Sequence, residues 1–467
     1  MELKLRPARI IWPPYPHRAG FCITDDTDVA SLDEVRTVYD FLMAIGLRAT
    51  KTVWVHEATE LCGIPGLPSS TLRGVTLEDE DYLSYCRDLH ENGFEIALHG
   101  ASAGNNTREN TAAAFEFMEA HFGGSETFIC HSKNAENPYW EELTAPNRPL
   151  ELLLKTYTRH KAWGHVPTSP YFWGDICLKH VKQIRLFRTR RPNTLSVNPS
   201  MPYFRAETPY VNSWFGATKR RFADCTTSDE LKRLETENGL CVLYQYMHRY
   251  ADPDLGGGVD DFKKSAERLM GESRIWVDTT AVIMDRLRQI QSVFVLYRDR
   301  KSWLINAGDN DAADIQILLP PGVRFLLSGN GAQDGSTLVV KRLAAGSITE
   351  LSFDSQVRWQ GDRTQKLTKQ GRSTLGFGHG ELHVNLSDQT IKTPSNTDLA
   401  PSSFALSFKE GQRERRPFSK ASQRELMTLF SHQTQIIGRE FLLKGRRFNQ
   451  NKFLGDGEIR LENYESW

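Results

Sequence analysis

The sequence of 467 residues lacks any long hydrophobic run, any excess of charge of one sign and any internal repeat. No segment reaches the ~18 consecutive apolar residues that a transmembrane helix needs, so we expect no membrane-spanning helix and no membrane partner. Lys and Arg together number 58, as do Asp and Glu, so the formal net charge is zero. Overall charge therefore gives no reason to expect nucleic acid as a partner.

Paired cysteines are also absent, because the seven cysteines are an odd number without regular spacing. Cys22, Cys130 and Cys241 lie in apolar, strand-like runs, which is typical of reduced and buried thiols. The stretch MELKLRPARIIWPPYPHRAG at the start holds no apolar segment long enough for a signal peptide, and prolines interrupt it. We therefore expect a cytoplasmic protein.

The first half of the chain alternates short apolar runs with amphipathic helical patterns. Strands are predicted at 20–24, 48–55, 94–98 and 127–130, and helices at 31–47, 77–92 and 107–122. The pattern is unclear from about 140 to 220, and it returns with a helix at 228–237, a strand at 240–246 and helices at 260–270 and 279–290. This alternation predicts an α/β fold with a parallel sheet covered by helices.

A change in the pattern of apolar and polar residues near residue 290 indicates a second domain. Short apolar runs separated by turn residues follow from Ser292 and predict a small antiparallel β-domain. We expect an α/β domain at 1–290, a β-sandwich-like domain at 291–356 and an extension at 357–467 for which the sequence predicts no structure. Two Arg/Lys clusters in the extension are interspersed with Glu, which is typical of a solvated face.

Acidic residues and histidines follow four of the predicted parallel strands. They are Asp25, Asp26 and Asp28 after the first, and His99, His131 and His248 after later ones. Active sites of parallel barrels lie at this rim, because the strand ends and the following loops converge there. Taken singly, each residue has a structural explanation, and Asp28 is expected to cap the helix beginning near Ser31. Together they favour a functional site.

The residue types at this rim suit a catalytic metal. Two adjacent carboxylates, Asp25 and Asp26, share a closed pocket comfortably only if a cation or a proton compensates one of them. One carboxylate oxygen and two imidazole nitrogens form an open ligand set that leaves room for water and substrate. The second carboxylate can then act as a base, and a histidine across the site as an acid.

Four segments resemble the polysaccharide deacetylase superfamily. ITDDTD at 23–28 resembles its TFDDG motif, FEIALHG at 94–100 its second motif, and LCVLYQYMHRY at 240–250 the late strand with the terminal His. RIWVDTTAVIMDRLRQI at 274–290 is similar to the helical stretch that closes the barrel of larger bacterial members. The resemblance covers about 20–290 and implies a distorted (β/α)7-type barrel that hydrolyses N-acetyl or O-acetyl groups on sugars.

By motif position, the resemblance implies Asp25 as general base, Asp26 and His99 as metal ligands and His248 as general acid. The chain departs from the motifs at three places. Thr27 replaces a Gly, and Ala103 replaces the second metal-binding His. The Arg-Pro-Pro-Tyr-type third motif is absent, and NPYW at 137–140 is the candidate counterpart. His131, at the end of the next strand, offers a third ligand and is followed by Asn134 and Asn137. We expect a divalent metal, Zn²⁺ by preference, held by Asp26, His99 and His131.

Aromatic residues between 137 and 214 are candidates for sugar binding, because sugar faces stack on aromatic rings. The substrate-binding candidates are Asn137, Tyr139, Trp140, Trp163 and Trp173, with Tyr171 and Trp214 as further aromatics. His165, Asp175 and His180 lie among them and are weaker candidates. Ordinary core or loop packing would explain any single one of these rings equally well.

Two other functions fit the same residues. A glycoside hydrolase would use Asp25 and another carboxylate as an acid/base pair and would act without metal. A non-catalytic carbohydrate-binding scaffold would bind no metal, and the missing second-motif His at Ala103 favours it. Loss of activity on chelation distinguishes the deacetylase from both.

Overall fold

The computed structural model describes most of residues 8–392. The gaps within this range are 64, 67, 70–73, 132, 140–161, 190, 199–200, 204–207, 253–257, 299–300, 327–330, 358, 360–363, 367–371, 378–379 and 387–389. Trp140 and both Arg/Lys clusters of the extension therefore lie outside the described residues.

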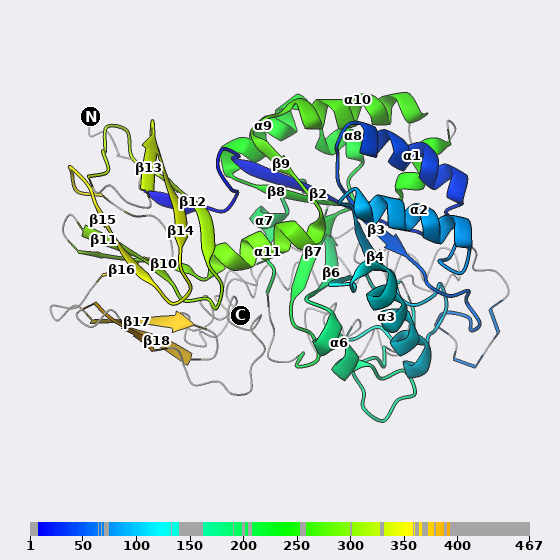
Figure 1. The fold of residues 1–467 in the computed structure, drawn as a ribbon. Helices are drawn as coiled ribbons and strands as arrows, with labels where there is room; N and C mark the ends of the chain where they lie inside the picture. Colours follow the sequence, from blue (N-terminus) through cyan, green and yellow to red (C-terminus); the bar gives the residue numbers. More distant parts are fainter. Residues whose placement is uncertain are drawn as a thin grey trace, which may run out of the picture.

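A closed parallel barrel of seven strands forms the first part of the chain (Figure 1). Its strands are β2 (Ala19–Asp25), β3 (Thr50–Val53), β4 (Glu95–Leu98), β5 (Thr127–Phe128), β6 (Gln183–Thr189), β7 (Trp214–Thr218) and β8 (Leu240–Gln245). Pairing of β2 with both β3 and β8 closes the ring, and β9 (Ile275–Val277) adds to β2 outside it. The predicted α/β barrel is confirmed.

Helices follow the strands and cover the barrel. They are α1 (Leu32–Ala44), α2 (Glu80–Glu91), α3 (Arg108–Phe122), α6 (Gly174–His180), α7 (Thr194–Val197), α8 (Phe222–Cys225), α9 (Ser228–Glu237), η1 (Met247–Ala251), α10 (Gly258–Gly271) and α11 (Thr280–Gln291). Strand β2 is buried along its whole length, because both of its faces are covered. Phe21 and Ile23 pack with the helices, whereas Cys22 belongs to a second core.

The start of α1 corrects one expectation. Ser31 is its N-cap: its hydroxyl accepts from the Glu34 amide, and the Glu34 carboxylate accepts from the Ser31 amide. This reciprocal pair satisfies the helix end without an additional acid. Asp28 is therefore not the cap, and its side chain is left for another role.

Antiparallel strands begin directly after α11. One sheet has the order β1 (Arg9–Ile11), β12 (Ala312–Leu318), β14 (Thr337–Leu343), β13 (Gly331–Asp334), and the other has the order β15 (Ile348–Ser352), β11 (Lys301–Asn306), β10 (Val293–Arg298), β16 (Thr364–Lys366). A third comprises β17 (Arg372–Phe377), β18 (Gly380–Asn385) and β19 (Thr390–Lys392). Through β1, a strand from the start of the chain joins this part of the fold.

Helix α11 lies between the barrel and the antiparallel sheets (Figure 1). Its Ile283 and Leu287 belong to a core that also includes Cys22 and Val242 of the barrel and Ile315 of β12. The two parts thus share buried apolar surface. Among the described residues, no helix combines the length and the apolar character needed to cross a bilayer.

Candidate metal centre

The polar residues of the barrel rim lie where the strands end. Strand β2 ends at Asp25, β4 at Leu98 and β5 at Phe128. The chain directly after these strands carries Asp26 and Asp28, His99, and His131. Parallel strands bring their carboxyl ends to one rim, so side chains far apart in the sequence meet there.

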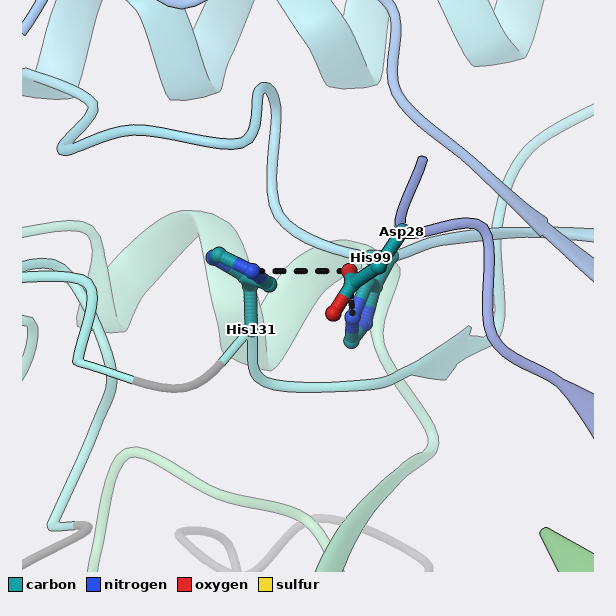
Figure 2. A group of neighbouring side chains, drawn as sticks. All are labelled: Asp28, His99 and His131. Atoms are coloured by element: carbon teal, nitrogen blue, oxygen red, sulfur yellow. Dashed lines mark ion pairs between the residues drawn. The ribbon is translucent and has the colours of Figure 1, made fainter. Parts of the chain in front are cut away.

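Two imidazoles converge on the carboxylate of Asp28 (Figure 2). The Nε2 atoms of His99 and His131 each lie 3.4 Å from Asp28 Oδ1. One ligand atom from each of these three residues lies within 4.8 Å of the others. The two rings meet edge to face, with centroids 5.2 Å apart. One carboxylate and two imidazoles thus share a space of the size that one metal ion occupies.

The other nitrogen of each ring fixes its orientation. His99 Nδ1 lies 2.9 Å from the carbonyl oxygen of Ile129, and His131 Nδ1 lies 2.9 Å from Asn134 Oδ1. Both partners are acceptors, so each Nδ1 donates its proton to its partner and each Nε2 faces the carboxylates. A cation bound there would replace any proton on Nε2 and use its lone pair. This is the tautomer that a metal ligand needs, and outer acceptors of this kind orient metal-bound histidines.

Two carboxylate oxygens beside the rings are buried without a hydrogen-bond partner among the described residues: Asp28 Oδ1 and Asp26 Oδ2. Asp26 Oδ1 lies 3.2 Å from His99 Nε2 and accepts from the amide of Asp28. Burial lowers the pKa of His99, but the carboxylates of Asp26 and Asp28 outweigh it and raise the pKa to about 9. The pocket therefore favours positive charge.

The residues present fit a divalent cation. Buried anionic oxygens without donors are costly unless a cation compensates them. Here they lie beside two Nε2 lone pairs, and this mixed N/O set suits Zn²⁺. The sequence predicted Asp26, His99 and His131 as ligands, and the structure brings Asp28, His99 and His131 together, with Asp26 next to His99.

Asp25 lies beside this group in a buried ion pair. Its Oδ2 is 2.8 Å from Lys51 Nζ and accepts from the Tyr39 hydroxyl at 2.9 Å. Its Oδ1 accepts from the amide of Met247 at 2.7 Å. Asp25 and Lys51 are both fully buried. The ion pair and these donors stabilise the ionised form of Asp25 and hold the start of η1 to the end of β2.

His248 lies on η1 and is 2% exposed. Burial lowers its pKa, and its Nδ1 has no hydrogen-bond partner among the described residues. Its ring meets that of Tyr246 edge to face at 6.1 Å, and the Tyr246 hydroxyl lies 3.4 Å from Asp28 Oδ2. Tyr246 thus connects His248 with the carboxylate of the metal group.

Two of the proposed substrate-binding residues have structural partners. Trp173 is fully buried against Phe115 and Phe128, so neither face of its indole is free for a sugar, and this candidate is corrected to a core residue. Asn137 is 1% exposed, and its amide donates to the carbonyl oxygen of His131.

Two of the remaining aromatic candidates stack on neighbouring rings, whereas Trp214 is fully buried. Trp163 is half-buried and stacks on Tyr171 with centroids 5.8 Å apart. Tyr139 is buried and stacks on His165 at 4.1 Å. Trp163 therefore stays the best aromatic candidate for a substrate in this part of the chain, whereas His180 packs on Phe115 and Asp175 pairs with Arg108.

Sequence reasoning placed Asp28 at the rim but assigned it as a helix cap, and it missed Lys51. The capping box of Ser31 and Glu34 was visible in the sequence and already removed the reason to assign Asp28 as a cap. Lys51 lies within the fully buried strand β3, where a lone cation signals a buried acidic partner.

Comparison with known proteins gives only distant similarities. No protein-family profile matches the sequence, and no curated protein matches it. Among solved structures, the chain is similar to a protein from Mycobacterium smegmatis assigned as a polysaccharide deacetylase, at 10% identity over 61% of this chain and 95% of that one, with a TM-score of 0.33.

Two further structures show similarity of the same order. An assigned polysaccharide deacetylase from Pseudomonas aeruginosa PAO1 has 9% identity over 55% of this chain and 72% of that one, with a TM-score of 0.31. Puue allantoinase has 8% identity over 59% of this chain and 93% of that one, with a TM-score of 0.34. Similarities of this size transfer no activity to the chain, so the geometry of the site has to support its function.

Proposed function

We propose that this chain is a metal-dependent hydrolase that removes acetyl groups from a carbohydrate. The observation that carries the proposal is the convergence of His99 and His131, through Nε2, on the buried and otherwise unpartnered Oδ1 of Asp28. The resemblance of ITDDTD and FEIALHG to deacetylase motifs supports the acetyl group and the sugar as substrate. The half-buried Trp163, stacked on Tyr171, supports a sugar-binding surface.

Asp28, His99 and His131 would hold the ion, with Asp26 as the neighbouring carboxylate. When bound, a divalent cation such as Zn²⁺ would polarise the acetyl carbonyl and lower the pKa of a water molecule. The tautomers fixed by Ile129 and Asn134 keep both Nε2 atoms available for this purpose.

Asp25 is the proposed general base, as its motif position implies. Lys51, Tyr39 and the Met247 amide stabilise its ionised form, in which Oδ1 retains a lone pair for the proton of an attacking water. Asp26 is the alternative base, because its Oδ2 is buried and has no partner among the described residues. A base of this kind contributes about 10²–10⁴-fold in rate.

His248 is the proposed general acid. Its lowered pKa means that it rests in the neutral form. The proton that Asp25 takes from the attacking water would therefore have to reach His248 before His248 protonates the departing amine or alkoxide. The unpartnered Nδ1 is the atom that can take up this proton. Tyr246, in contact with both His248 and Asp28, keeps this histidine beside the metal group.

Acetate release from a panel of acetylated oligosaccharides tests the proposal. Chelation should abolish the activity, and added Zn²⁺ should restore it. Cleavage of the oligosaccharide chain without metal and without acetate release would instead support a glycoside hydrolase. Asp25→Asn should lower turnover by about 10²-fold or more while bound metal is retained. Asp26→Asn should lose bound metal if Asp26 is a ligand, or turnover alone if Asp26 is the base.

A matched control separates loss of chemistry from loss of fold. Asp175 pairs with Arg108 at the protein surface, so Asp175→Asn removes an ion pair without affecting the rim. Asp25→Asn leaves Lys51 without its buried partner. The thermal unfolding of each variant should therefore be measured together with its activity. Near-normal turnover of a folded Asp25→Asn variant would transfer the role of base to Asp26.

A further inference from the structure

A buried carboxylate lies behind His131, on the side away from the metal group. Glu136 is 1% exposed, although its side chain is charged in its ordinary state. No ion pair to it is found among the described residues, and neither the deacetylase motifs nor the proposed chemistry gives it a task. Burial of a carboxylate costs free energy, so the contacts of Glu136 indicate its role.

All contacts of the Glu136 carboxylate are with N–H donors. Oε1 accepts from Asn134 Nδ2 at 2.8 Å and from Asn106 Nδ2 at 2.7 Å, and Oε2 accepts from the Asn106 amide at 3.0 Å. Since both oxygens accept, the arrangement suits the ionised carboxylate rather than the acid. Burial raises the pKa of Glu136, and the N–H donors oppose this shift by stabilising the carboxylate, which lies two residues from Asn134.

The Asn134 amide transmits this arrangement to His131. An amide has one acceptor and one donor end, and the donor end of Asn134 is taken by Glu136 Oε1 and by the carbonyl oxygen of Ser102. Its oxygen must then face the other way, where it lies 2.9 Å from His131 Nδ1. That contact fixes the proton on Nδ1 and leaves the Nε2 lone pair directed at Asp28.

We propose that Glu136 is a positioning residue of the metal centre, which acts through Asn134 to hold His131 as a ligand. The inference rests on the proposed metal site and deepens it. The chain of contacts runs from carboxylate to amide to imidazole to ion. It replaces the direct carboxylate–imidazole contact that often orients metal-bound histidines, and its negative end makes His131 a stronger donor to the ion.

The test compares Zn²⁺ affinity by competition with a chromophoric chelator. Glu136→Gln should weaken Zn²⁺ binding by about 10–100-fold, because an amide can satisfy only one of the two sets of donors. Asn134→Leu should weaken it to a similar extent by removing the acceptor from His131 Nδ1. Glu95→Gln is the matched control, since this partly buried carboxylate also accepts from a hydroxyl and an amide but lies at the far end of β4.

A rescue variant separates positioning from folding. Asn134→Asp alone places two carboxylates side by side and should weaken binding. In the double variant N134D/E136Q, the new carboxylate at position 134 contacts His131 directly, and the new side-chain amide at position 136 donates to that carboxylate. The affinity for Zn²⁺ should therefore recover to within about threefold of the wild type. Proton–nitrogen NMR of the imidazoles, without metal, should show His131 protonated at Nδ1 in the wild type and in the double variant, and should show this preference lost in Asn134→Leu.

The Zn²⁺-binding measurements distinguish failure of the proposed metal site from failure of the proposed role of Glu136. If the wild-type chain binds no Zn²⁺, the proposed metal site is wrong. If the wild type binds Zn²⁺ and folded Glu136→Gln binds it equally well, Glu136 has no positioning role. The same conclusion follows if Glu95→Gln loses as much affinity as Glu136→Gln. If Glu136→Gln does not fold, the double variant decides, and failure of a folded double variant to recover affinity overturns the inference.

Discussion

Lys51 and Asp25 form an ion pair that water does not reach. Both side chains are fully buried, and Lys51 Nζ lies 2.8 Å from Asp25 Oδ2. In such a place the attraction between the charges offsets a large cost of desolvation, and loss of one partner leaves the other charge unpaired. The pair therefore maintains the rim as well as the ionisation of the proposed base.

Lys51→Met should lower the free energy of unfolding by about 3–5 kcal/mol, because it leaves the Asp25 carboxylate buried without its cation. The double variant D25N/K51M should recover most of this loss, since neither charge remains. Urea denaturation measures both. Lys182→Met is the control: Lys182 pairs with Glu126 at a half-exposed position and should cost no more than about 1 kcal/mol. Equal losses for the two lysines would show that the pair is not effectively buried.

His248 should make the fold sensitive to mild acid. Burial lowers its pKa below the value of about 6.5 that it has in the unfolded chain. As pH falls through about 6.5 the unfolded state takes up the proton first, so the stability present at higher pH declines. Between pH 7 and 5, wild-type unfolding temperature should therefore fall more steeply than that of His248→Gln. Parallel curves for the two proteins would refute the assignment of a neutral buried imidazole.

The loop after β4 is the element that shapes the metal group. It begins at His99 and turns at Gly100, whose φ of +77° is a left-handed conformation that favours glycine. A Cβ at this glycine would lie 3.3 Å from Asn134 Nδ2 and 3.3 Å from the Ser102 carbonyl oxygen. The turn thus brings the loop close to the residue that orients His131.

Gly100→Ala should weaken Zn²⁺ binding as well as the fold. A non-glycine residue in the left-handed region costs about 1–2 kcal/mol. Gly46→Ala is the matched control, because its φ is +73° and nothing lies within 4 Å of its added Cβ. Both variants should lose similar stability in urea, and only Gly100→Ala should lose affinity for Zn²⁺. Equal affinities would mean that the loop tolerates displacement of Asn134.

At the scale of elements, the barrel strands outside the stretch at 140–220 could be predicted, and the two within it, β6 and β7, could not. Strands β2, β4, β5 and β8 fall within or close to the predicted ranges. Strand β6 (Gln183–Thr189) was missed because its arginines read as surface residues. Arg185 is in fact 2% exposed and lies over the Tyr244 ring at 3.7 Å, a contact that only tertiary structure creates.

The residues of the site could likewise be predicted only in part. Strand-end histidines could be placed at the rim from the sequence, since parallel topology alone brings them together. The choice between Asp26 and Asp28 as the neighbour of both imidazoles depends on how the chain turns after β2, where Asp28 donates its amide to Asp26 Oδ1. The pattern of the sequence does not predict this turn.

At the scale of the whole molecule, α11 and its buried arginine connect the barrel with the first antiparallel sheet of the described residues. Arg286 is 8% exposed and donates to the carbonyl oxygens of Trp12, Ala313 and Asp314. Burial lowers its pKa to about 10, which still leaves it charged at neutral pH. One guanidinium thus connects the barrel with strand β12 and with the segment after β1.

Arg286→Met should lower the free energy of unfolding by on the order of 3 kcal/mol, because carbonyl oxygens lose a charged donor in a buried place. Arg233→Met is the control, since Arg233 forms an exposed i,i+4 pair with Glu237 that is worth about 0.3–0.5 kcal/mol. Both variants can be compared by calorimetry. A loss no larger than that of the control would mean that the apolar core alone joins the two parts.

Metal content of the purified chain is the most direct test of the central claim, which is that Asp28, His99 and His131 hold one divalent cation. After reconstitution with Zn²⁺ and removal of excess, elemental analysis should give about one ion per chain, as expected for a single ligand set. His99→Ala, His131→Ala and Asp28→Asn should each retain far less, while the surface variant Asp175→Asn should match the wild type. A folded wild-type chain without bound Zn²⁺, or a His131→Ala variant that retains it fully, would contradict the account.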